Sequence, residues 1–218
     1  MRHSALAVLA LAGTLLLSGA AQAGIVVTYG AGVTWPTAPD VQTAHPSQYI
    51  GYNHPYYGGY FTQSFKVATT LVVEKLYVMA AREQASTSLM WMKFYEVDNV
   101  HSVSLGTLVG TVAATANELS PSTSSVITEF ALSGANQITL PARAGDAGYA
   151  ILCYADDSSA RWEAGKAGNV YADGYWGGSY AGTSDMIMAL VGSPIPEPAT
   201  MSLLVIGGVA ALIRRKRQ

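Results

Sequence analysis

Short segments in which apolar and polar residues alternate, separated by turn-forming residues, follow one another from residue 60 to residue 193. In residues 89–97, Met92 and Phe94 fall on one face of an extended chain, and Trp91 and Lys93 fall on the other. Successive side chains of a β-strand point to opposite sides, so this pattern predicts strands with one buried face. We expect further strands at residues 25–29, 61–67, 71–80, 105–113, 125–132, 137–140, 148–154, 169–172 and 186–191.

Short strands at fairly regular spacing, with turns rich in Gly, Ser and Pro between them, predict an all-β fold. The most economical arrangement is an antiparallel β-sandwich of the jelly-roll or lectin-like type over residues 60–193. Residues 24–59 precede it as a segment rich in Tyr, Gly and Pro. Its prolines interrupt any long element, so we expect one short strand there, followed by largely irregular chain.

The charge of the central region restricts the partners it can bind. Residues 24–193 contain 7 basic and 13 acidic side chains, which gives a net charge of −6. Nucleic-acid binding depends on clustered Lys and Arg that contact phosphates, so the sequence argues against a nucleic-acid partner.

The N-terminal residues form a secretory signal. Arg2 gives a short basic region, residues 5–17 form an apolar stretch, and Ala21 and Ala23 flank a small-x-small cleavage site. The sequence predicts a signal peptide over residues 1–23, export by the Sec machinery and a mature chain that starts at Gly24. The alternative is an uncleaved N-terminal anchor.

The C-terminal residues 194–218 have three parts in a fixed order: a proline-rich spacer, an apolar stretch over residues 201–213 and a basic end. The basic end consists of Arg214, Arg215, Lys216 and Arg217. The apolar stretch is shorter than the roughly 20 residues that span a bilayer comfortably. Long basic side chains can extend such a span, and they mark the cytoplasmic side. We therefore expect a single transmembrane helix with the domain outside.

The tripeptide Pro196-Glu197-Pro198, followed by the helix and the basic end, resembles the PEP-CTERM sorting signal. The resemblance implies recognition by an exosortase and processing near the tripeptide. It also implies an inner-membrane stage before processing and later delivery to the cell envelope or extracellular matrix. Such signals accompany exopolysaccharide production in Gram-negative bacteria. An ordinary tail anchor is the alternative.

The central region also resembles a loosely defined group of sandwich domains in exported, tail-anchored bacterial proteins. The similar segments are Gln63-Ser64-Phe65, Phe94-Tyr95-Glu96-Val97 and Tyr171-Ala172 with Gly174. This resemblance implies a fold rather than an activity.

Motifs for catalysis are few. Glu96 and Asp98 are two residues apart, so their carboxylates are expected on one side of a strand, as in sandwich glycosidases of the laminarinase type. His101 stands where those enzymes carry a second glutamate. Cys153 lies in a strand-like run and is expected to be a buried thiol. We assign no catalytic residue, metal site or cofactor.

Aromatic residues gather with carboxylates and glycines in residues 154–185. A flat aromatic ring stacks on a sugar while nearby polar groups bind its hydroxyls, so the candidate carbohydrate-binding residues are Trp162, Tyr171, Tyr175 and Trp176. Two alternatives remain open. The rings could cover one face of a sheet, or calcium could bind at Asp156, Asp157 or Asp173.

These observations predict an exported, non-catalytic envelope or matrix protein with a structural or adhesive role in an exopolysaccharide environment. A carbohydrate-binding module is the alternative, and a secreted polysaccharide hydrolase comes third.

Overall fold

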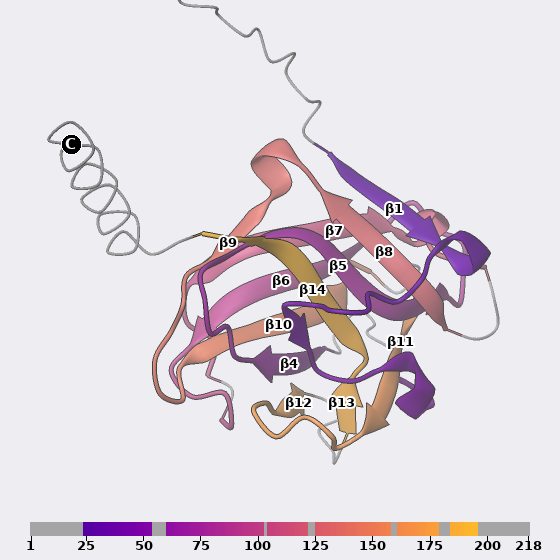
Figure 1. Cartoon of the computed structure of the whole chain (residues 1–218). Helices are drawn as coiled ribbons and strands as arrows, with labels where there is room; N and C mark the ends of the chain where they lie inside the picture. Colours follow the sequence, from indigo (N-terminus) through magenta and orange to yellow (C-terminus); the bar gives the residue numbers. More distant parts are fainter. Residues whose placement is uncertain are drawn as a thin grey trace, which may run out of the picture.

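The computed structural model describes residues 24–53, 60–102, 104–121, 125–157, 161–178 and 184–195. Within them, two antiparallel sheets form a single fold, so the all-β prediction is confirmed (Figure 1). Helical structure in this part of the chain is limited to 3-10 turns at Gly30–Gly32, Pro46–Gln48, Ala116–Glu118 and Gly134–Asn136.

The larger sheet has the strand order β1-β8-β5-β11-β13, and β2, β3, β9 and β14 add to it through β14, β11 and β5. Its strands are β1 (Ile25–Tyr29), β2 (Val41–Gln42), β3 (Tyr49–Asn53), β5 (Leu71–Arg82), β8 (Val126–Leu132), β9 (Ile138–Leu140), β11 (Trp162–Gly168), β13 (Ser184–Met186) and β14 (Met188–Pro194).

The smaller sheet has the order β12-β4-β10-β6-β7. Its strands are β4 (Phe61–Phe65), β6 (Leu89–Val97), β7 (Leu108–Thr115), β10 (Gly148–Ala155) and β12 (Trp176–Gly178). The inner faces of both sheets contribute to one hydrophobic cluster; Phe61 and Phe94 from the smaller sheet lie in it with Phe130 and Trp162 from the larger. Burial of these faces is the main force that holds the sheets together.

β5 is the longest strand and changes partners along its length. Leu71–Val73 pair with β9, and the pairing with β8 begins at Lys75. Opposite β14, the register shifts so that Glu74 is the extra residue of a bulge. The shift changes the phase of the alternation, so Val73 and Leu76 both face the core. This explains the two interleaved apolar faces in the sequence of this segment.

The N-terminal segment contains more strand pairing than its composition predicts. β1 pairs with β8, β2 with β14 and β3 with β11, so all three belong to the larger sheet. Val33 and Trp35, which lie between β1 and β2 in the chain, pack on Tyr77 of β5. They cover part of the outer face of that strand.

Two predicted elements near the C-terminal end of the domain need correction. The strand predicted at residues 169–172 is wrong, because these residues form a turn and the strand is β11, seven residues earlier. The strand predicted at residues 186–191 is split into β13 and β14, which pair with different neighbours.

Candidate functional site

Trp162, the largest residue of the predicted aromatic stretch, lies in the core. Its side chain has 0% exposure, and its ring centroid lies 6.2 Å from that of Phe61 across the two sheets. It is therefore unavailable for stacking on a ligand, and its assignment as a sugar-binding residue is corrected.

The other aromatic residues of that stretch do not form a shared exposed surface in the described part of the chain. Tyr171 packs against the core, and its hydroxyl accepts a hydrogen bond from the Lys66 backbone N–H at 3.1 Å. Tyr175 is 41% exposed. Trp176 begins β12 opposite Gln63, and its side chain lies outside the described structure.

The buried carboxylate of Asp185 explains why this stretch turns. Its Oδ2 accepts hydrogen bonds from the backbone N–H groups of Val170 and Tyr171 at 2.7 and 2.8 Å. The Gln63 amide donates to Oδ1 at 3.4 Å, and its own oxygen accepts from Met186 N–H. Because the Val170 and Tyr171 donors bind a carboxylate, they are not part of a strand ladder.

Glu96 and Asp98 lie on the same side of the chain, as their spacing predicts, and both contact Arg143. Arg143 Nη1 lies 3.0 Å from Glu96 Oε1, and Nη2 lies 3.4 Å from Asp98 Oδ1. A guanidinium that binds both carboxylates holds them as an ion-paired group.

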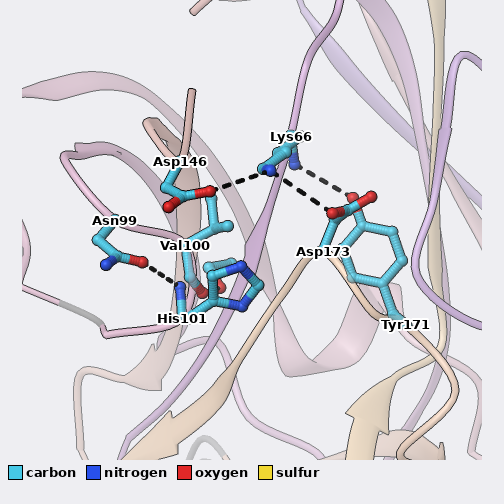
Figure 2. Close-up of polar contacts among 8 residues, drawn as sticks. Lys66, Asn99, Val100, His101, Asp146, Tyr171 and Asp173 are labelled. Carbon is cyan, nitrogen blue, oxygen red and sulfur yellow. Dashed lines mark hydrogen bonds and ion pairs between the residues drawn. The ribbon is translucent and has the colours of Figure 1, made fainter. Parts of the chain in front are cut away.

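A second basic residue links the neighbouring loops. Figure 2 shows Lys66 between Asp146 and Asp173, with Nζ 3.5 Å from an oxygen of each, and Tyr171 beside its backbone. In the same view, the Asn99 side chain accepts a hydrogen bond from the backbone N–H of His101 at 2.8 Å. The ion pairs of Lys66 join three loops at this end of the smaller sheet.

The three acids considered for calcium have separate partners. Asp156 accepts from the Trp91 indole, Asp157 accepts from the Ser88 hydroxyl at 2.5 Å, and Asp173 binds Lys66. Within the described ranges, the side chains give no group of three or more His, Cys, Asp or Glu that could hold a metal ion.

A half-buried aromatic pair lies instead on the outer face of the smaller sheet. Trp91 of β6 and Tyr154 of β10 are directly opposite in the strand register. Their rings are nearly parallel, with an interplanar angle of 17° and centroids 6.4 Å apart. Both side chains are half-buried, whereas Met90, Met92 and Cys153 beside them face the core. The alternation of β6 therefore presents Trp91 to solvent.

Lys93 and Asp156 place a cation and an anion beside this pair. Lys93 Nζ lies 5.2 Å from the Trp91 centroid and 5.1 Å from the Tyr154 centroid, over both rings. The hydrogen bond to Tyr154 raises the pKa of Lys93, so the ammonium stays charged. The Trp91 indole N–H donates to Asp156 Oδ1 at 2.5 Å and fixes the orientation of the indole.

The residues around the pair leave its surroundings open. On β7, the residues opposite Trp91 and Lys93 are Ala113 and Thr111, which are small. On the other side, Phe61 of β4 pairs with Cys153, and the ladder between β4 and β10 ends at that pair. Tyr60 is 48% exposed and precedes the inward-facing Phe61. We call four side chains on this face the Trp91 surface. They are Trp91 and Lys93 of β6, Tyr154 of β10, and Asp156, which follows β10.

The alternation of residues 89–97 predicts that Trp91 and Lys93 share one face of a strand, but it does not identify them as binding residues. The signal was present in the alternation of residues 89–97. The partner Tyr154 lies more than 60 residues away, and its pairing with Trp91 follows from sheet topology rather than local sequence.

Cys153 lies one position from this surface but points the other way. It is buried and free of disulfides, and burial raises the pKa of its thiol well above the ordinary value. Its expected role as a buried apolar residue agrees with this position.

The comparison with protein families finds a match at the C-terminal end of the chain. A model of the PEP-CTERM protein-sorting motif matches residues 194–217, beginning at the last residue of β14. A search of curated proteins finds no match to the chain.

The motif defines an exported protein that an exosortase sorts and processes after a membrane-anchored stage. Within that class, the chain is a PEP-CTERM domain-containing protein. Of the residues that the structure describes, none forms a helix long and apolar enough to cross a membrane. The predicted signal peptide, the tripeptide and the C-terminal apolar stretch lie outside the described residues.

Proposed function

We propose that this protein is a non-catalytic adhesin of the cell envelope or extracellular matrix and that it binds exopolysaccharide through the Trp91 surface. Sorting by an exosortase delivers the chain to the compartment where such polymers occur. In this proposal, the two sheets form a lectin-like sandwich, Sec exports the chain through its signal peptide, and the C-terminal helix anchors it until processing.

The observation that carries the proposal is the nearly parallel Trp91–Tyr154 pair with Lys93 over both rings. An aromatic face carries partial negative charge and attracts cations and polarised C–H groups. The C–H face of a pyranose is such a group, so a sugar ring can stack on these ring faces when the Lys93 side chain moves aside.

The polar groups supply the hydrogen bonds that a sugar needs. The Asp156 carboxylate accepts from hydroxyl groups, and the Lys93 ammonium donates to hydroxyl or carboxylate oxygens. A mostly apolar surface with a few placed polar groups is the general plan of a small-molecule site. On an open sheet face, that plan suits an internal segment of a long polymer.

The experiment is retention of the exported protein on the producing strain's own polysaccharide, measured by affinity electrophoresis. Replacement of the two rings should abolish retention, whereas replacement of the exposed Tyr175 should leave it unchanged. Loss of retention with the Tyr175 variant would instead favour the candidate residues predicted from the sequence, to which Tyr175 belongs.

A structural role without a ligand is the second candidate, and strand β1 favours it. β1 is the edge of the larger sheet, has no charged residue or proline, and exposes Val26 at 62%. Natural edge strands usually carry charged residues or proline, which protect them against edge-to-edge pairing. Self-association of the exported protein in sedimentation velocity, without binding to polysaccharide, would support this role.

A further inference from the structure

The sorting motif begins inside the folded sheet. The motif match starts at residue 194, and Pro194 is both the last residue of β14 and the partner of Leu71 in β5. One residue further on, the Ile195 backbone N–H donates to the Thr70 carbonyl at 2.9 Å. The last ladder bond is therefore one residue before the tripeptide Pro196-Glu197-Pro198.

Two carboxylates hold this end of the strand in addition to the ladder. The Gly192 backbone N–H donates to Asp40 Oδ2 at 2.9 Å, and the Ser193 hydroxyl donates to Glu74 Oε1 at 2.5 Å. Gly192 also lies so close to β5 that a Cβ on it would be 2.0 Å from the Val72 carbonyl oxygen. We call residues 192–195 the β14 end.

The β14 end is held almost entirely by polar contacts at the surface. Ser193, Pro194 and Ile195 are exposed, while the upstream residues Met188 to Leu190 are buried in the core. Segments with few buried apolar contacts and exposed backbone hydrogen bonds open at low free-energy cost, whereas core strands open only with the whole domain. The β14 end can therefore detach while the rest of β14 stays in place.

A processing enzyme that acts near the tripeptide must bind the chain on both sides of the bond it breaks. Extended peptides are recognised through their backbone N–H and C=O groups. The Ile195 N–H already donates to Thr70, and the carbonyl of Pro194 lies at the end of the same ladder. Enzyme and sheet thus compete for the same backbone.

We propose that exosortase processing requires the β14 end to detach from β5 and from the two carboxylates that bind it, Asp40 and Glu74. The folded domain then limits access to its own sorting motif. This proposal rests on the motif and the sheet, and it is independent of polysaccharide binding.

A cross-strand disulfide tests the proposal in the full chain. Ser193 and Val72 are directly opposite in the register. The Cα atoms of directly opposed residues in antiparallel strands lie close enough for a disulfide to bridge them. The variant S193C/V72C is expressed with the exosortase, and conversion to the processed form is followed on gels. The native Cys153 is buried and does not compete for pairing.

We expect the oxidised variant to stay unprocessed and to be processed at the wild-type rate after reduction. A matched control, V26C/A131C, ties the directly opposed pair of β1 and β8 and should be processed normally in both redox states. Insertion of a flexible Gly/Ser segment after Ile195 should restore processing of the oxidised S193C/V72C chain, because it supplies free backbone without opening the sheet.

Processing of the oxidised S193C/V72C chain at the wild-type rate would overturn the proposal, since the β14 end would then remain docked during the reaction. Failure of the inserted segment to restore processing would also overturn it. In that case the disulfide would act by some means other than withholding backbone from the enzyme.

Discussion

Trp91 and Tyr154 lie directly opposite each other on β6 and β10, with their rings 17° from parallel and Lys93 over both. The pair stands on the solvent side of the smaller sheet, and Trp162 lies on the core side of the larger one. The Trp91 side chain is therefore accessible to a ligand, whereas the Trp162 side chain packs in the core.

Truncation of the two tryptophans should affect stability very differently. Trp91→Ala removes a half-exposed cross-strand pair and should lower the free energy of unfolding by about 1 kcal/mol. Trp162→Ala leaves a large cavity in the core and should cost about 3–5 kcal/mol. Urea denaturation followed by far-UV circular dichroism measures both. Equal losses would contradict the assignment of Trp91 to the surface.

Lys93 should favour acidic polymers. Among the described cations, Lys66, Lys75 and Arg143 are ion-paired, whereas Lys93 has no carboxylate within ion-pair distance in that part of the chain. Lys93→Gln should weaken binding to a uronate-containing polysaccharide roughly tenfold, the effect of losing one charged hydrogen bond. It should also reduce the salt dependence of binding. An unchanged salt dependence would show that Lys93 does not contact the polymer.

The Cys153 thiol should make the protein less stable in alkali. Burial raises the pKa of this group above its ordinary value of 9.0, so the unfolded chain loses the proton at lower pH than the folded chain. The protonated thiol makes its full contribution to the free energy of unfolding below about pH 9. This contribution is lost as the pH rises toward the pKa of the folded state, at up to about 1.4 kcal/mol per pH unit. Denaturation curves at about pH 8, 9 and 10 should show this slope.

Cys153→Ala is the control for that slope, because it removes the titrating group and leaves the buried tyrosines. Burial also raises the pKa of Tyr149 and Tyr171, but their ordinary value is 10.0, so their effect begins at higher pH. If the alanine variant kept the full slope just above about pH 9, another group would be responsible.

Asp185 should be essential for the turn that precedes β12. Asp185→Ala leaves the part-buried N–H groups of Val170 and Tyr171 without their acceptor, at a cost of about 1–3 kcal/mol for the two donors together. Hydrogen exchange at these two amides should accelerate more than exchange in β6. An equal acceleration in the turn and in β6 would indicate global destabilisation rather than release of the turn.

Strands with strong alternation were predictable from the sequence. The bounds of residues 89–97 agree with β6, where the alternating residues Met90, Met92 and Phe94 face one core. The β11 segment was missed because Ala and Gly dominate it. Its small residues are required by packing, as a Cβ on Gly165 would lie 2.6 Å from Met79. Such a requirement depends on the neighbouring strand and leaves no local β pattern.

The candidate site was only partly predictable for the same reason. The 154–185 stretch is rich in aromatic residues. In the structure, however, Asp185 holds a turn in it by a hydrogen bond, and Trp162 is buried in the core. The pairing of β6 with β10 instead brings Tyr154 to Trp91. Composition could indicate that aromatic rings were available, and the register decided which of them meet on the surface.

The central claim is tested most directly by affinity electrophoresis of the exported protein in gels that contain the producing strain's exopolysaccharide. We expect strong retardation of the wild-type protein and of Tyr175→Ala. The Trp91→Ala/Tyr154→Ala double variant should not be retarded, and all three proteins should give folded circular dichroism spectra. Equal retardation of the double variant and the wild type would contradict the claim that the Trp91 surface binds polysaccharide.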